Sequence, residues 1–237
     1  MLLMTPWYRT LLFLMAFCAQ GLVSHAQAFE DSMAQRTMAC TVCHGAQGRA
    51  GPDGYYPRLA GKPAGYLYNQ LNNFRVGWRH YPLMQGLIDP LDDRYLREIA
   101  THFASLSVPY PPPRPSTASA AELERGRKLV KEGREDAGLP ACMQCHGLEM
   151  MGVNPSTPGL LGLPADYINA QLGGWQTGQR RTASPDCMAQ VARKLSAADI
   201  SAVSHWLASQ PVPPNAHPAD KKPDSRSKVE LNCASAP

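Results

Sequence analysis

The stretch Cys40-Thr41-Val42-Cys43-His44 decides how this sequence is read, because it recurs 102 residues later as Cys142-Met143-Gln144-Cys145-His146. Beyond the two motifs, matching residues continue in the same order with nearly the same offset. The matched sets are Pro57, Leu59, Gly61, Tyr66, Gln70, Leu71, Gly77 and Arg79 in the first copy, and Pro158, Leu160, Gly162, Tyr167, Gln171, Leu172, Gly178 and Arg180 in the second. A preserved order with small changes of offset indicates a duplicated domain.

The segments outside the repeats complete the predicted domain organisation. A short apolar run at residues 11–17 follows Arg9 and leads to Ala26-Gln27-Ala28, the pattern of a cleaved export signal. A Pro-rich stretch between the copies favours an extended linker. We therefore predict the following organisation: signal peptide 1–28, first domain 29–108, Pro-rich linker 109–119, second domain 120–213 and flexible C-terminal tail 214–237.

Composition supports a globular exported protein. The chain has 237 residues, of which 44% are hydrophobic and 18% charged, with a net charge of +4. This charge is small and no basic run with interleaved aromatic residues occurs, so we expect no nucleic-acid partner. No stretch beyond the signal is long and apolar enough to span a bilayer, which needs about 20 residues. The sequence predicts a soluble protein in the periplasm.

Both copies have the periodicity of helices. The spacing of Leu67, Leu71 and Phe74 after Pro63 predicts a helix, and the second copy repeats this pattern. The last helix of the first copy is expected to begin at Asp92, and that of the second copy at a Ser196-x-x-Asp199 capping pattern. A leading helix is predicted at residues 121–131. No convincing period-2 strand is present, so we expect an all-α fold.

Each copy carries the attachment signature of haem c, Cys-x-x-Cys-His. The spacing lets both sulfurs reach the two vinyl groups on one porphyrin edge, and the next histidine can then offer a ring nitrogen to the iron. The predicted cofactor-binding residues are Cys40, Cys43, His44, Cys142, Cys145 and His146. The alternatives are a redox disulfide and a zinc site built from both pairs. The additional histidine and the absence of a βαβ pattern favour two covalently bound haem c groups.

Equivalent positions in the two copies suggest the sixth iron ligands. Met84 and Met188 each precede a matched leucine by seven residues and lie in sequence that reads as a loop between helices. We therefore predict iron ligation by His44 and Met84 in the first copy and by His146 and Met188 in the second. The rival ligands are His80 and Cys187.

Two cysteines remain after the motifs and the signal are set aside. Cys187 and Cys233 are the two, and in an oxidising compartment they could form a disulfide that ties the tail over the second haem crevice. This hypothesis rests on counting alone. Cys187 as an iron ligand is the competing assignment.

With these motifs in view, the sequence resembles the dihaem cytochrome c4 family. The resemblance rests on the two haem motifs, on Pro57-x-Leu59-Ala60-Gly61, and on the string from Tyr66 to Arg79 with Met84 downstream. It covers nearly all of residues 33–213, with Leu163 standing where the family usually has a polar residue. It implies two tandem cytochrome c-fold domains joined by the Pro-rich linker, packed about a pseudo-twofold axis, with His/Met iron in each and the haem propionates close together.

The expected function is single-electron transfer, because an iron with both axial positions filled does not readily bind substrate. No catalytic residue and no small-molecule substrate are predicted. The family resemblance implies redox protein partners, namely a dehydrogenase, a bc1-type donor, a terminal oxidase, a reductase or other cytochromes, some of them membrane-bound. Two alternatives remain. One is a dihaem enzyme, of the thiosulfate dehydrogenase or peroxidase kind, with unusual ligation at the second haem. The other is a dedicated cytochrome subunit of a dehydrogenase.

Overall fold

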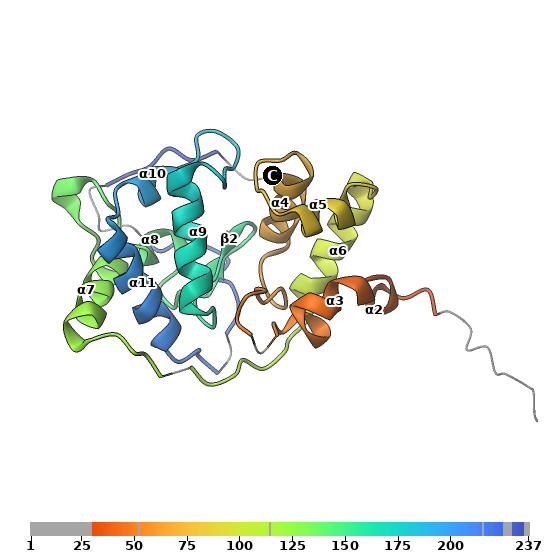
Figure 1. Cartoon of the computed structure of the whole chain (residues 1–237), viewed down its shortest axis with the longest axis horizontal. Helices are drawn as coiled ribbons and strands as arrows, with labels where there is room; N and C mark the ends of the chain where they lie inside the picture. Colours follow the sequence, from red (N-terminus) through yellow and green to blue (C-terminus); the bar gives the residue numbers. More distant parts are fainter. Residues whose placement is uncertain (1–29, 52, 114, 215, 225–228, 235–237) are drawn as a thin grey trace, which may run out of the picture. The chain divides into compact units, whose positions relative to one another are not determined.

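Both repeats fold into helices, and a corresponding set of three helices follows each Cys-x-x-Cys-His motif. In the computed structural model (Figure 1), these are α4 (Ala64–Arg75), α5 (Pro82–Ile88) and α6 (Asp93–Ser105) in the first copy, and α9 (Ala165–Thr177), α10 (Cys187–Arg193) and α11 (Ala197–Ser209) in the second. The all-α prediction is confirmed. Among the described residues there is one pair of two-residue strands, β1 (Gly152–Val153) and β2 (Thr157–Pro158), and it is too short to show any period in the sequence.

The structure describes residues 30–51, 53–113, 115–214, 216–224 and 229–234. The predicted signal peptide at 1–28 therefore lies outside the described residues. Residues 33–237 contain both repeats and form one compact unit, distinct from the unit of residues 1–32. Within the described ranges, no helix has the length and hydropathy that a membrane crossing requires.

The first helix of each set begins just after a proline and buries one apolar stripe. Pro63 caps α4, which buries Leu67 and Phe74. Pro164 caps α9 in the same way, and α9 buries Ile168, Leu172 and Trp175. A proline suits this position because it has no N–H to leave unpaired and its φ is close to helical. The helices predicted from the apolar spacing are confirmed.

The third helix of each set begins at a side-chain cap. The Asp92 carboxylate accepts a hydrogen bond from the Tyr95 backbone N–H at 2.7 Å. At the start of α11, the Ser196 hydroxyl accepts from the Asp199 N–H, and the Asp199 carboxylate accepts from the Ser196 N–H. This reciprocal pair is a capping box, which satisfies two backbone donors that have no partner within the helix.

The segments that lead into the two motifs differ. The first copy has α2 (Met33–Arg36), α3 (Met38–His44) and a short 3₁₀ turn, η2 (Ala46–Gly48). The second copy has a longer helix, α7 (Ala120–Lys131), then η3 (Glu135–Ala137) and α8 (Met143–His146). Helix α7 packs closely on α11, because a Cβ atom built on Gly126 would lie 2.1 Å from the carbonyl oxygen of Ala202. Only glycine allows the two backbones to approach this far.

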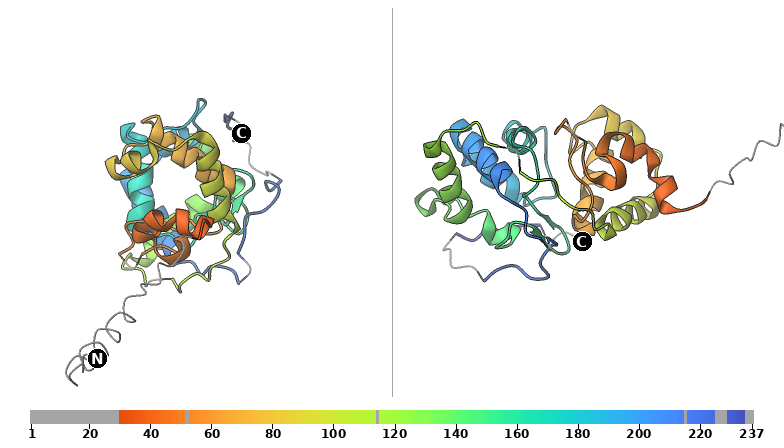
Figure 2. Two further views of the ribbon diagram at one scale, coloured as in Figure 1. Left: turned by 90° about the vertical axis from the view of Figure 1, so that its right-hand side faces the viewer. Right: turned by 90° about the horizontal axis from the view of Figure 1, so that it is seen from below.

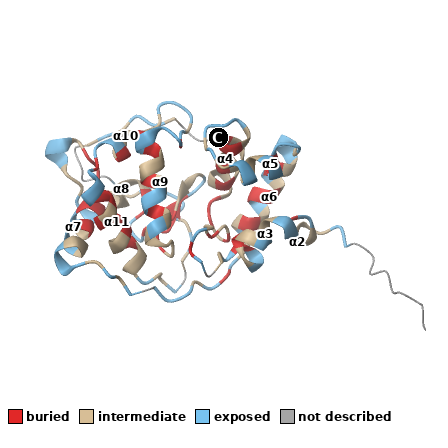
Figure 3. Ribbon diagram, viewed as in Figure 1, coloured by how far each residue is buried: buried red, intermediate tan, exposed pale blue. Residues whose placement is uncertain are grey.

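The two copies also differ in how their apolar cores are divided. In the second copy the buried residues form one continuous cluster that includes Leu129, Met151, Trp175 and Leu207. In the first copy they form two clusters, one around Phe103 and the other around Phe74, Ile88 and Leu96. Figure 1 and the right-hand view of Figure 2 show the helices of the two copies as two groups. Figure 3 shows the buried residues gathered inside each group.

None of the described residues between Leu106 and Ser119 is helical. The first part of this segment is held by Arg58, whose guanidinium donates to the carbonyl oxygens of Val108 and Pro109. The same guanidinium lies 3.8 Å from the centre of the Tyr110 ring. The linker therefore leaves the first copy in a fixed direction.

Candidate haem sites

The first haem motif occupies helix α3 and orients its histidine through the backbone. His44 is buried, and its Nδ1 lies 2.8 Å from the carbonyl oxygen of Pro57. A carbonyl can only accept, so Nδ1 carries the proton and Nε2 keeps its lone pair. A second hydrogen-bond partner of this kind fixes the ring of an iron-ligating histidine. Cys40 and Cys43 are both free and half-buried beside it.

The second motif has the same arrangement. His146 is buried at the end of α8, and its Nδ1 lies 2.7 Å from the carbonyl oxygen of Pro158. Cys142 and Cys145 are free. Pro57 and Pro158 were matched in the repeat, but their role as acceptors was not predicted from the sequence. The signal was present, since both prolines recur in the repeat at nearly the same offset as the motifs.

Burial keeps the imidazoles of both motifs neutral. It lowers the pKa of His44, with Arg79 acting in the same direction and the Pro57 hydrogen bond opposing it. It also lowers the pKa of His146, where Lys62 and Lys222 act in the same direction and the Pro158 hydrogen bond opposes them. A neutral imidazole with an available Nε2 is the form that binds iron.

Burial also keeps three of the motif thiols protonated. It raises the pKa of Cys40 and of Cys145, and it raises the pKa of Cys142 to about 12. Such thiols lack the lowered pKa that marks a redox Cys-x-x-Cys pair. Neither pair forms a disulfide. In the described part of the chain, no three His, Cys, Asp or Glu side chains gather into a metal site, so the two pairs do not form one zinc centre. Two free thiols beside an oriented neutral imidazole, in each copy, fit haem c.

The predicted methionine ligands lie in short helices and not in loops. Met84 is in α5, which begins with Pro82 in its first turn, and Met188 is in α10, which Asp186 caps by accepting from the Ala189 N–H at 3.0 Å. These helices have seven residues each, too few for the sequence to show a helical period. Met84 packs against the cluster around Phe74, and Met188 against the core of the second copy. Their assignment as iron ligands stays a prediction.

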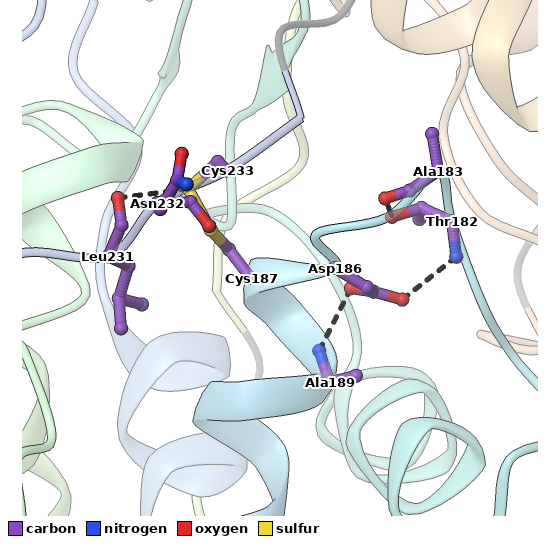
Figure 4. Close-up of a disulfide and its surroundings, with 8 residues drawn as sticks. All are labelled: Thr182, Ala183, Asp186, Cys187, Ala189, Leu231, Asn232 and Cys233. Carbon is purple, nitrogen blue, oxygen red and sulfur yellow. Dashed lines mark hydrogen bonds between the residues drawn. A yellow bond between two sulfur atoms is a disulfide. The ribbon is translucent and has the colours of Figure 1, made fainter.

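The rival ligands occupy other places. His80 is exposed, and its backbone N–H donates to the carbonyl of Gln179 at 3.3 Å. Cys187 forms a disulfide with Cys233, across 46 residues of sequence (Figure 4). The disulfide hypothesis is therefore confirmed. Because the Cys187 sulfur is in the disulfide, it cannot bind an iron as a thiolate.

The disulfide anchors a tail that runs along the second copy. The backbone N–H of Ala234 donates to the carbonyl of Pro185, and that of Asn154 donates to Ala219 at 2.8 Å. Inside the haem motif, the Gln144 side chain donates to the Val229 carbonyl at 2.9 Å. The tail thus contacts helix α8, which carries the second attachment motif, as well as the start of α10.

A symmetric group of side chains joins the two copies. Arg79 donates to Gln70 at 3.0 Å and to Gln171 at 2.7 Å, and Arg180 donates to Gln171 at 2.7 Å and to Gln70 at 2.9 Å. Each arginine therefore bonds the glutamine of its own copy and that of the other. The backbones of Arg79 and Arg180 form an antiparallel bridge. All four residues recur in the repeat, which was the signal for them, but their pairing across the copies was not predicted.

Fold and site together define a class: a mostly helical c-type cytochrome with two haem motifs in tandem. No protein-family profile matches the chain. The sequence is 40% identical over 177 residues to the thiosulfate dehydrogenase electron acceptor of Thiomonas intermedia, covering 74% of this chain and 80% of that protein. It is 33% identical over 191 residues to cytochrome c4 of Pseudomonas aeruginosa, covering 79% of this chain and 92% of that protein.

The solved structures agree with the sequence relatives. The crystal structure of reduced cytochrome c4 from Pseudomonas stutzeri matches with a TM-score of 0.65 at 33% identity, over 74% of this chain and 95% of that one. The chain belongs to the dihaem cytochrome c4 family. It carries two covalently bound haem c groups in two cytochrome c-fold domains, and it transfers electrons between redox proteins.

Proposed function

We propose that this protein is a periplasmic carrier that accepts single electrons from a dehydrogenase of the thiosulfate dehydrogenase class and delivers them to a further redox protein, such as a terminal oxidase or reductase. The observation that carries the proposal is the pair of identical histidine settings, His44 on Pro57 and His146 on Pro158, in halves joined directly. The relative from Thiomonas intermedia is named as the electron acceptor of such a dehydrogenase, which supports the choice of donor.

The proposal includes the iron ligands and the division of the chain. His44 and Met84 would hold one iron and His146 and Met188 the other, within domains at residues 29–108 and 120–213. The linker is 109–119 and the tail 214–237. A signal at 1–28 would export the chain, and export suits thioether formation and the disulfide of Cys187.

The haem supplies the one-electron chemistry, and the protein supplies its orientation and surroundings. The Pro57 and Pro158 carbonyls hold each imidazole with Nε2 unprotonated. Burial around both histidines excludes water. This exclusion lowers the reorganisation energy of electron transfer, because less solvent must reorient when the charge on the iron changes. Methionine on the opposite face would raise the potential above that of bis-histidine haem.

The enzyme alternative depends on unusual ligation at the second haem. Cys187 was its candidate ligand, and the disulfide with Cys233 occupies that sulfur. The structure therefore favours a carrier with His/Met ligation at both haems. The alternative of a dedicated dehydrogenase subunit shares the same donor and differs only in whether the complex dissociates.

The first experiment separates carrier from enzyme. The fully loaded oxidised protein is mixed with thiosulfate alone, and then with thiosulfate and a thiosulfate dehydrogenase, while the haem absorbance is followed. We expect rapid reduction only in the second mixture, with two electrons taken up per molecule because two haems are present. Steady turnover of thiosulfate by the protein alone would contradict the carrier assignment. Failure of the dehydrogenase to reduce it would contradict the proposed donor.

A second experiment tests the ligands in separate variants, Met84→His and Met188→His. Each is expected to abolish the far-red charge-transfer band of one ferric His/Met haem and to lower the potential of that haem by on the order of a few tenths of a volt. Met151→Leu, in the buried core of the second copy, is the matched control and should leave both haem spectra unchanged. An intact band at both haems in Met188→His would show that Met188 is not a ligand.

A further inference from the structure

Lys62 is a buried cation at the junction of the two copies. Its side chain is 3% exposed, and its Nζ donates to the backbone carbonyl of Gly159 at 2.8 Å, across 97 residues of sequence. Taking an ammonium group out of water is costly unless it finds charged or strongly polar partners. A lysine retained in such a place needs a reason beyond packing.

The groups around Lys62 in the described residues offer it no carboxylate. No ion pair involves Lys62, and the charged group that acts on it is Arg58, which has the same sign. Arg58 is itself held by the Ala60 carbonyl and the Tyr110 ring. Burial lowers the pKa of Lys62 to about 7, and Arg58 acts in the same direction. The ammonium has three N–H donors and the Gly159 carbonyl uses one, so two remain for an anion.

The acceptor of Lys62 lies next to the support of the second histidine. Gly159 follows Pro158 in the chain, and the Pro158 carbonyl is the group that His146 Nδ1 binds at 2.7 Å. Lys62 of the first copy therefore binds the carbonyl of Gly159, the residue directly after the proline whose carbonyl orients His146. A bound haem has two propionate groups, and a carboxylate of this kind is the anion that the free N–H donors of Lys62 would bind.

The repeat makes this feature one-sided. The residue matched to Lys62 in the second copy is Leu163, which lies between Gly162 and Pro164 as Lys62 lies between Gly61 and Pro63. Leu163 packs against the apolar core of the second copy. The second copy therefore has no cation at the position that corresponds to Lys62.

We propose that Lys62, a residue of the first domain, tunes the potential of the second haem. Its buried positive charge raises the reduction potential of the haem attached at Cys142 and Cys145 more than that of the haem attached at Cys40 and Cys43. Reduction adds one electron, delivered by the protein's redox partner, and lowers the charge on the iron centre by one. A fixed cation nearby therefore favours the reduced state. Low local dielectric strengthens the effect.

The test is Lys62→Gln, which keeps an N–H donor for the Gly159 carbonyl and removes the charge. The potentials of both haems are measured at pH 6 by NMR-monitored redox titration, in which each haem is assigned through contacts with its own domain. We expect the second haem to fall relative to the first, so that the equilibrium constant for electron sharing between them changes by roughly tenfold, which is about 59 mV for one electron. Lys62→Arg should restore the wild-type difference.

The control is Lys128→Gln, the same change on the exposed face of α7, where water screens the charge. It should leave the difference between the haems unaltered. An equal fall in both haems, or no fall in either, in Lys62→Gln protein with two haems and unchanged spectra would overturn the proposal.

A measurement on the unaltered protein covers the case in which Lys62→Gln does not fold. The side-chain resonance of Lys62 should move when the second haem is reduced and stay in place when only the first is reduced. Movement with the first haem alone would also overturn the proposal. The inference depends on the two haems and not on the identity of the donor, so its failure would leave the proposed partner untouched.

Discussion

The two halves of this molecule hold haem in the same way but are stabilised differently. Each half has free cysteines, a buried histidine on a proline carbonyl and a methionine in a seven-residue helix. Around this shared arrangement, the second half adds the α7–α11 packing, one continuous core and a tail fixed by a disulfide. The comparison teaches that after duplication the cofactor setting was retained while the surrounding scaffold diverged.

The exposed apolar side chains follow the same division. Among the described residues, the first half exposes Met38, Val42, Leu83 and Leu87, whereas the second half exposes Leu148. Val42, inside the first attachment motif, is 84% exposed. The corresponding part of the second half, at Gln144, donates a hydrogen bond to the tail. The tail thus occupies in the second half a place that is open in the first.

Removing the disulfide is expected to have the largest effect on the difference in stability between the two halves. Cys187→Ala with Cys233→Ala frees a loop of 46 residues, and chain entropy predicts a loss of about 4 kcal/mol in the free energy of unfolding. Denaturant titration, followed separately at the two haems, should show an earlier transition in the second half alone. Wild-type protein treated with a reductant is the matched control and should behave like the variant, because thioethers are not reduced. Unchanged unfolding in both would mean that the tail does not stabilise the second half.

A larger residue at Gly126 is expected to disrupt the packing of α7 on α11, which only the second half has. In Gly126→Ala the new methyl would lie 2.1 Å from the Ala202 oxygen, so α7 must move away from α11. We expect a loss of about 3 kcal/mol, the upper end of overpacking effects, measured by thermal unfolding of the second half.

Gly173→Ala in α9 is the control for this prediction. Its Cβ would meet nothing within 4 Å, and its counterpart Asn72 in the first half already carries a side chain. It should therefore stabilise the protein by about 0.5–1 kcal/mol, since alanine favours the helix. Equal effects from the two substitutions would refute the close approach of α7 to α11.

The cap of the last helix gives a smaller difference, and this one depends on pH. Burial alone would raise the pKa of Asp199, but the hydrogen bonds from the Ser196 backbone and from Arg125 outweigh it and lower that pKa from 3.8 to about 2. A lowered pKa contributes stability that is complete above about pH 4 and is lost as the pH falls through about 2. The shift corresponds to about 2 kcal/mol.

The variant Asp199→Asn isolates this contribution. Its deficit in unfolding free energy relative to wild type should be about 2 kcal/mol near pH 6 and should shrink as the pH falls from about 4 to about 2. Asp92→Asn, at the N-cap of α6, keeps a good N-cap and is expected to change stability little near pH 6. A constant deficit across the range would show that Asp199 acts by packing and not by charge.

Local patterns in the sequence were enough to predict the haem motifs and the long helices. Cys-x-x-Cys-His carries its chemistry in five residues, and α4, α6, α9 and α11 are long enough to show an apolar period. The caps at Asp92 and Ser196 follow from short-range hydrogen bonding, which the sequence also displays. The duplication supported these assignments because the haem motif and the helical patterns recur in the second copy.

Features that depend on distant parts of the chain were not predicted. The short helices around Met84 and Met188 have fewer than two clear turns, so they read as loops. The Lys62 contact with Gly159 depends on how the two copies meet, which no local pattern specifies. The same holds for the tail beside Gln144. The pairing of Cys187 with Cys233 was found only because counting left no other cysteine outside the haem motifs and the predicted signal.

The reciprocal bonds of Arg79 and Arg180 have a kinetic consequence. Since each arginine holds a glutamine from both copies, neither copy can turn away without breaking bonds at both arginines. An electron that enters through one copy therefore reaches the other by an internal step, whose effective concentration is fixed by the junction and not by collisions. Diluting the protein should slow its encounters with partners while leaving the exchange between its own two irons unchanged.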